Sequence, residues 1–220
     1  HPVAAERSLR RAVELAPNGA LGQIYLAIFL MLVRRCGEEE AVARARLALR
    51  LDPLSPATHS WSGTILCFSG QPEEGLRTLE QQVAATPHLW MPHYFLSIAL
   101  SSAGRLAEAR STGEKAVDLS SGNSVTLSLL VCLCYLAGDR ERADELFERL
   151  RRRAEAGYVP PMFLARPHLA RGEGDAALRR VEEALAAKDP WVSTHHLFSP
   201  GVVPAEPRID ALIAGSFGRR

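Results

Sequence analysis

Apolar residues recur at three- and four-residue steps along most of the chain. In MPHYFLSIALSSAGRLAEARSTGEKAVDL (91–119), one apolar stripe precedes Gly104 and a second follows it. Such steps place apolar side chains on one face of a helix. The pair of stripes predicts a helix-turn-helix unit with Gly104 at the turn, where glycine adopts the left-handed conformation without a Cβ penalty.

The same unit recurs along the sequence. Each copy has an apolar stretch, a glycine and a charged amphipathic stretch, and successive glycines are 33, 34, 34 and 34 residues apart. The turn glycines are Gly37, Gly70, Gly104, Gly138 and Gly172. A fixed period of this length indicates supersecondary units that stack on one another.

Two further features accompany the period. A small residue lies five positions after each turn glycine: Val42, Gly75, Ala109, Ala143 and Ala177. Prolines follow several second helices: Pro17, Pro53, Pro87 and Pro190. Together with the two-helix period, these features resemble the tetratricopeptide repeat (TPR) family over residues 24–190. The resemblance implies an all-α fold, a TPR-type α-solenoid that forms a right-handed superhelix.

The predicted organisation has three parts. Residues 1–17 have the pattern of a second helix with no first helix before it, which predicts that His1 is not the native start. Residues 18–190 form five helical hairpins, and residues 191–220 form an irregular segment followed by a short capping helix. Pro167 predicts a kink or early break near residues 163–167, because proline removes a helical hydrogen bond.

A narrower resemblance concerns four stretches: LRLDPLSP (49–56), GYVPPMFLA (157–165), GEGDAALRRVEEALAAKDPWV (172–192) and PRIDALI (207–213). They resemble the C-terminal repeat region of bacterial signalling proteins, where such repeats follow a serine/threonine kinase, a nucleotide cyclase or a winged-helix transcriptional activator. The resemblance implies a regulatory module of a larger protein. It does not extend to residues 193–206, whose packing is left open.

Composition agrees with a helical domain of this kind. Apolar residues make up 47%, charged residues 23%, and the formal net charge is +1, which argues against nucleic acid as a partner. The longest apolar run, LGQIYLAIFLMLV (21–33), is too short to cross a bilayer. We expect a cytoplasmic location, or a periplasmic one if a transmembrane helix precedes the sequence.

No pattern indicates catalysis, a cofactor or a metal. Cys132 and Cys134 are two residues apart on a helix and point to different faces, so buried thiols are expected there. The adjacent His195 and His196 diverge and have no ligand at metal-binding spacing. GEGDAA (172–177) follows no strand, which argues against a phosphate loop.

In repeats of this kind the first helices line a groove that binds a peptide or protein. We expect the residues ten, six and three positions before each turn glycine to face it, and call them the first-helix row. The candidate binding residues are Arg34, Ser60, Thr64, Tyr94, Ser128, Tyr135 and Arg166. Tyr94 and Tyr135 are candidate aromatic anchors, and half of the row could instead be ordinary packing between helices.

The predicted function is non-catalytic binding of a protein or peptide, within a larger signalling or transcription-regulatory protein. Self-association, or sensing of a small ligand by a transcriptional regulator, is the alternative. The first-helix row holds no lysine or asparagine, so a clamp for a terminal carboxylate is not expected.

Overall fold

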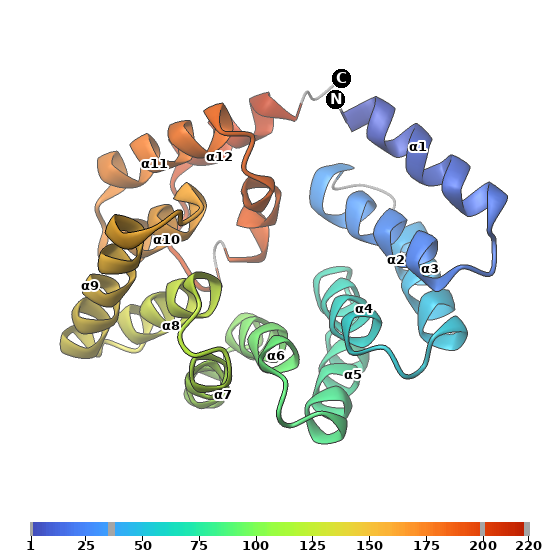
Figure 1. Cartoon of the computed structure of the whole chain (residues 1–220), viewed down its shortest axis with the longest axis horizontal. Helices are drawn as coiled ribbons and strands as arrows, with labels where there is room; N and C mark the ends of the chain where they lie inside the picture. Colours follow the sequence, from blue (N-terminus) through green and yellow to red (C-terminus); the bar gives the residue numbers. More distant parts are fainter. Residues whose placement is uncertain (1, 35–37, 199–200, 218–220) are drawn as a thin grey trace. The chain divides into compact units, whose positions relative to one another are not determined.

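The computed structural model is all-α (Figure 1). It describes residues 2–34, 38–198 and 201–217, without the side chains of Arg34 and Glu38. The chain divides into two compact units, His1–Ala99 and Leu100–Arg220, and the division lies within α6 (Trp90–Ser102). Each unit is described by itself.

Paired antiparallel helices build the first unit. Its elements are α1 (Pro2–Leu15), α2 (Ala20–Phe29), the π-helical turn η1 (Leu30–Arg34), α3 (Glu38–Leu51), α4 (Pro56–Phe68), α5 (Pro72–Ala85) and most of α6. Helix α2 packs against α3, and α4 packs against α5. The first helices α2 and α4 also contact each other, as expected for stacked hairpins.

The second unit continues the same arrangement. After the last turn of α6 come α7 (Leu106–Leu119), α8 (Ser124–Leu136), α9 (Arg140–Ala156), α10 (Pro161–Arg171), α11 (Gly174–Ala186), the 3₁₀ helix η2 (Pro190–Leu197) and α12 (Pro207–Ser216). The pairs α8–α9 and α10–α11 are hairpins, and the first helices α8 and α10 pack together. The prediction of an all-α, TPR-like solenoid built from helix-turn-helix units is confirmed.

The turn glycines have the predicted left-handed conformation. Their φ angles are 80° at Gly70, 77° at Gly104, 79° at Gly138 and 85° at Gly172, whereas Gly37 lies outside the described residues. After Gly104, the amide of Arg105 donates to the carbonyl of Leu100, and equivalent bonds follow Gly70, Gly138 and Gly172. These are the bonds of a Schellman-type helix end, which requires positive φ at the glycine.

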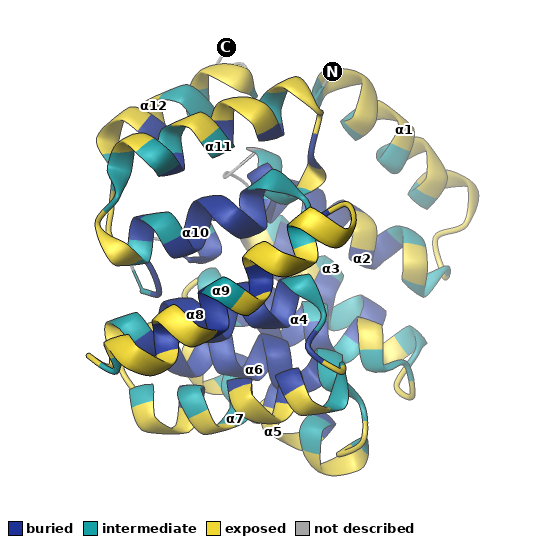
Figure 2. Ribbon diagram, turned by 60° about the vertical axis from the view of Figure 1, so that its left-hand side comes forward, coloured by how far each residue is buried: buried dark blue, intermediate teal, exposed yellow. Residues whose placement is uncertain are grey.

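First and second helices differ in burial (Figure 2). In α8 every residue from position 125 to position 134 is buried, as expected for a helix that is apolar on all sides. In the second helix α9 only Ala143, Leu146, Phe147 and Leu150 are buried, at three- and four-residue steps. The second helices therefore have a solvated face, and the first helices form the core.

Glycine allows α4 and α5 to approach each other closely. A Cβ atom on Gly75 would lie 2.5 Å from the carbonyl oxygen of Gly63 and would overlap the Sγ atom of Cys67. No side chain larger than hydrogen fits at that crossing. The equivalent small residues Val42, Ala109, Ala143 and Ala177 are also buried, which explains the small residue in every unit.

The expected break at Pro167 is wrong. Helix α10 continues without interruption through Pro167 to Arg171. Proline cannot donate to the carbonyl four residues earlier, but the residues around it, from Met162 to Pro167, are all buried in the second unit. Tertiary packing against α8, α9 and α11 therefore outweighs the local cost of the proline.

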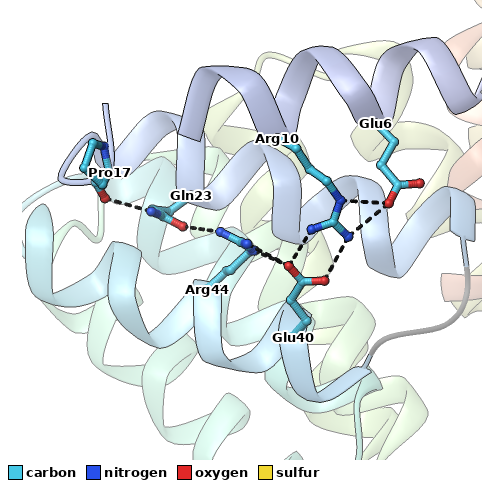
Figure 3. A network of polar contacts seen from close by, with 6 residues as sticks. All are labelled: Glu6, Arg10, Pro17, Gln23, Glu40 and Arg44. Carbon is cyan, nitrogen blue, oxygen red and sulfur yellow. Dashed lines mark hydrogen bonds and ion pairs between the residues drawn. The ribbon is translucent and has the colours of Figure 1, made fainter. Parts of the chain in front are cut away.

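A polar network fixes α1 on α2 and α3 (Figure 3). The guanidinium of Arg10 donates to both carboxylate oxygens of Glu40, at 2.8 and 3.0 Å. Arg44 donates to the same carboxylate at 2.7 Å and to the side chain of Gln23 at 2.8 Å. The hydrogen bond from Arg10, with Arg44 contributing, lowers the pKa of Glu40 to about 2.

The elements after α11 follow the repeat register. Residue 206 lies 34 positions after Gly172, and α12 begins directly after it. Helix α12 packs on α11, as a second helix of a further unit would, and Arg208 contacts Asp175 at 2.8 Å. In the place of a first helix this unit has η2, whose start is capped by the side chain of Asp189.

Candidate functional site

The predicted binding residues lie on the first helices, where most of their side chains are buried. Those of Ser60, Thr64, Tyr94, Ser128 and Arg166 are 3% exposed or less. Tyr135 is half-buried, and the side chain of Arg34 lies outside the described residues. The described part of this row therefore belongs largely to the packing between helices.

Tyr94 belongs to an aromatic cluster in the first unit. Its ring centroid lies 5.3 Å from that of Phe95 and 6.3 Å from that of Trp90, in edge-to-face geometry. Trp61 of α4 packs against Phe95 in a tilted arrangement, with ring centroids 4.7 Å apart. Such pairs add to the stability gained by burial alone, so Phe95 connects α6 to α4, and Tyr94 packs on Phe95 and Trp90 of its own helix.

The hydroxyl residues of the row are also internal. Thr64 donates to the carbonyl oxygen of Ser60 one turn earlier, at 2.8 Å. Ser60 and Ser128 occupy the same position in two different hairpins, ten residues before the turn glycine, and both are fully buried. The same position holds Tyr94 and Met162 in other hairpins and is buried there too, so it is a position of the helix packing whatever the size of its side chain.

Tyr135 is the candidate with the most accessible side chain among those described. Its hydroxyl donates to the carboxylate of Asp144 on α9, and Arg171 lies 3.8 Å from the same carboxylate. Burial, followed by the hydrogen bond to Asp144, raises the pKa of Tyr135. The tyrosine therefore stays neutral, and its hydroxyl lies beside the charged pair of Asp144 and Arg171.

Arg166 is the most unusual member of the row, because a fully buried arginine is rare. It donates to the hydroxyl of Thr194 at 2.5 Å and to the carbonyl of Trp191 at 3.3 Å. Its guanidinium carbon lies 3.7 Å from the centroid of the Phe198 ring and 5.7 Å from that of Phe163. The charge is thus held by cation–π contacts and polar groups of η2.

Residues after α11 return to the first helices of the second unit. We call residues 190–198 and 201–206 the return segment. The hydroxyl of Ser101, three positions before Gly104, donates to the carbonyl of Gly201 at 2.9 Å. Phe198, Val202 and Val203 are buried. Two positions of the first-helix row, Ser101 and Arg166, therefore contact the chain's own C-terminal region.

The sequence pattern did not identify the contacts of the return segment. Ser101 and Gly201 are one hundred residues apart, and no local periodicity connects them. One signal was available: Arg166 directly follows the apolar stretch MFLA (162–165), and a buried guanidinium requires polar or aromatic partners. Trp191 and Phe198 are the first two aromatic residues after the last complete hairpin, and both contribute to the surroundings of Arg166.

A separate hollow of about 360 Å³ lies where α9, α10 and α11 meet. Its basic residues are paired with acidic neighbours: Arg151 with Glu148 at 3.3 Å, and Arg180 with Glu183 at 2.7 Å. Paired surface charges of this kind give little net attraction for an anion. The hollow therefore has no built ligand site.

Metal and thiol chemistry have little support in the part of the chain that the structure describes. That part contains no group of three potential metal ligands, and His195 faces the carboxylate of Asp210 at 3.3 Å. Cys132 and Cys134 are buried free thiols, as expected. Burial raises the pKa of Cys132 to about 12, so the thiol is not a nucleophile at neutral pH.

None of the described helices combines the length and apolar character needed to cross a membrane. This agrees with the short length of the apolar run at residues 21–33, which is divided between α2 and η1.

Solved structures share the fold. A TPR protein from Thermus thermophilus is 20% identical, with a TM-score of 0.61 over 82% of this chain and 98% of its own. PilW, a type IV pilus biogenesis factor, is 18% identical, with a TM-score of 0.61 over 90% and 91%. MamA from Desulfovibrio magneticus RS-1 is 23% identical, with a TM-score of 0.56 over 72% and 88%.

These similarities establish a TPR-like fold and nothing finer, because fold does not specify function. No protein-family model matches the chain, and no curated protein matches it. Nothing in the comparisons connects it to a kinase, a cyclase or a transcriptional activator.

Proposed function

We propose that the chain is a non-catalytic module that binds a protein or peptide on the first-helix row of its hairpins. The observation that carries the proposal is the return segment, since two positions of the row hold a main-chain carbonyl and an aromatic side chain. Stacked helical hairpins use the same surface to hold extended or helical ligands. The row thus offers a hydrogen-bond donor for a main-chain carbonyl and a guanidinium for an aromatic ring, both of which a bound peptide can use.

The biological setting is proposed from sequence alone. The four stretches that resemble bacterial signalling proteins support a role as a regulatory module beside an effector domain, in the cytoplasm unless a membrane helix precedes it. The three-part organisation is proposed as well: α1 is a helix with the second-helix pattern, residues 18–190 are five hairpins, and residues 191–220 are an irregular segment with a capping helix.

Site-specific photo-crosslinking tests the proposed function. A benzoylphenylalanine at position 135 places the reactive group at the half-buried edge of the row, whereas one at Leu54, which is 88% exposed in the α3–α4 turn, serves as control. We expect position 135 to give a crosslinked protein that position 54 does not give. Identical products at both positions would contradict binding on the row.

Self-association is the second candidate function. It would appear as a molar mass that rises with concentration in light scattering, and the same photo-crosslinker at position 135 would then give a product of twice the mass of the chain. A monomer at all concentrations would exclude this candidate.

A further inference from the structure

The return segment lies on the second unit as a ligand would lie on a peptide site. Its contacts involve groups that many peptides offer: Ser101 donates to the main-chain carbonyl of Gly201, and Arg166 donates to that of Trp191 and lies over the ring of Phe198. From the side chains of the return segment, the ring of Phe198 and the hydroxyl of Thr194 take part in the contacts with Arg166. The site therefore recognises an aromatic residue and main-chain groups, together with apolar side chains such as those of Leu197, Val202 and Val203, which are also buried.

Main-chain hydrogen bonds connect the two described parts of the return segment. The amides of Val202 and Val203 donate to the carbonyl of Phe198, at 2.6 and 2.9 Å. Gly201 lies directly against α6, where an added Cβ would be 3.0 Å from the Oγ atom and 3.2 Å from the Cα atom of Ser102. A glycine three residues after the aromatic residue thus allows the backbone to touch the helix.

We propose that the first-helix row of the second unit, with Ser101 and Arg166 as its polar contacts, binds an apolar peptide that carries an aromatic residue three positions before a glycine and adopts the helical turn of η2. The return segment occupies this site in cis, and a partner of the same chemistry binds by displacing it. This proposal rests on the proposed function, because it names the ligand chemistry and the competitor for the same surface.

Occupancy of the site by the return segment lowers the apparent affinity for a free peptide. A tethered segment acts at an effective concentration of about 1 mM, so a free peptide of equal intrinsic affinity binds only when this competitor is removed. Variants that open or lock the segment should therefore move the affinity in opposite directions.

The open variant is Gly201→Leu. Its side chain would clash with Ser102, while the backbone at Gly201 has no positive φ that a leucine would strain. Gly215→Leu is the matched control, because a Cβ at Gly215 meets nothing within 4 Å. The probe is a fluorescein-labelled synthetic peptide of residues 190–206, PWVSTHHLFSPGVVPAE, which includes the partners of both Ser101 and Arg166, and binding is followed by anisotropy.

The locked variant is Ser102→Cys with Gly201→Cys. A Cβ at position 201 would lie 3.5 Å from the Cβ of Ser102, within the range that a disulfide spans. Cys36 and Cys67 are replaced by serine in this background to prevent other pairing. The oxidised and reduced forms of one protein then compare a fixed segment with a free one.

We expect Gly201→Leu to bind the peptide at least about tenfold more tightly than the wild type or Gly215→Leu. The oxidised locked variant should not bind it, and reduction should restore binding. A peptide with alanine in place of Phe198 should lose binding in every form. Circular dichroism and thermal melting verify that each variant is folded.

Equal binding by the oxidised and reduced forms would overturn the proposal, as would a folded Gly201→Leu that does not bind the peptide. If the partner crosslinked at position 135 binds the locked and open variants equally, the proposed function stands and cis occupancy fails. If no partner is crosslinked but the peptide binds the open variant and not the locked one, the peptide site is supported and the proposed cellular role fails.

Discussion

The guanidinium carbon of Arg166 lies 3.7 Å from the centroid of the Phe198 ring, so a buried cation of α10 rests on an aromatic residue at the end of η2. Both side chains are almost completely excluded from solvent. The contact joins the last complete hairpin to the residues that follow it. In a region without a regular first helix, this pair replaces the helix packing that joins the other hairpins.

Replacing Arg166 with alanine should lower the free energy of unfolding by about 3 kcal/mol, because it removes a desolvated cation–π contact and two hydrogen bonds from a charged donor. Lysine should recover part of the loss, since it keeps the charge but not the planar fork. Urea denaturation measures both. Arg152→Ala, at a side chain 74% exposed, is the control and should change stability by less than about 0.5 kcal/mol.

A loss below about 0.5 kcal/mol for Arg166→Ala would mean that the contact with Phe198 is not formed in solution. The same result would weaken the proposed cis site, because Arg166 supplies its central contact.

Gly75→Ala should destabilise the first unit although alanine favours helices. The gain in helix propensity is about 1 kcal/mol, whereas a Cβ only 2.5 Å from the Gly63 carbonyl forces α4 and α5 apart and costs about 1–3 kcal/mol or more. Thermal melting should show a lower midpoint. Gly157→Ala, with open space around the added atom and an extended φ, should show no loss. Unchanged melting of Gly75→Ala would refute the close crossing.

The repeat itself could be predicted because its determinants are local. A glycine with positive φ and apolar residues at helical spacing fix each hairpin within about 30 residues, as Gly138 and the helices on either side of it illustrate. The burial of Tyr94 could not be predicted in the same way. First helices are apolar on several sides, so periodicity does not separate a groove-facing position from a packed one.

Two other features, the unbroken helix at Pro167 and the hydrogen bond from Ser101 to Gly201, depend on tertiary structure. Pro167 stays within an unbroken helix because its neighbours in α10 are buried. Rules based on the local sequence around a proline do not include this burial. The bond from Ser101 to Gly201 depends on the path of the whole second unit. The residues of the candidate site that sequence analysis missed are thus those supplied by distant parts of the chain.

The contact of Glu40 with Arg10 and Arg44 predicts an acid-dependent loss of stability. Because the pKa of Glu40 is about 2 in the folded protein and 4.5 ordinarily, its stabilising effect is present above pH 4.5 and is lost as the pH falls toward 2. In urea denaturation, the advantage of the wild type over Glu40→Gln should shrink across that range. Arg10→Met removes the main cause and should show the same pattern.

If the difference between the wild type and Glu40→Gln does not change with pH, the carboxylate is not held by Arg10 and Arg44, and α1 is fixed on α3 by other contacts. A residual advantage that survives at the lowest pH would measure the hydrogen bonds that a neutral side chain still accepts.

Tyr135→Phe should cost about 1 kcal/mol at pH 7, because it removes the hydroxyl that donates to Asp144. A double-mutant cycle with Asp144→Asn isolates this bond, and a coupling below about 0.3 kcal/mol would show that it contributes nothing. The raised pKa of Tyr135 predicts how this stabilisation depends on pH. The stability advantage of tyrosine over phenylalanine is complete below pH 10.0, the ordinary pKa of tyrosine. It declines as the pH rises further, because the hydroxyl ionises first in the unfolded state. Urea titrations at neutral and alkaline pH measure that decline, and an advantage that grows with pH would contradict the neutral hydroxyl as donor.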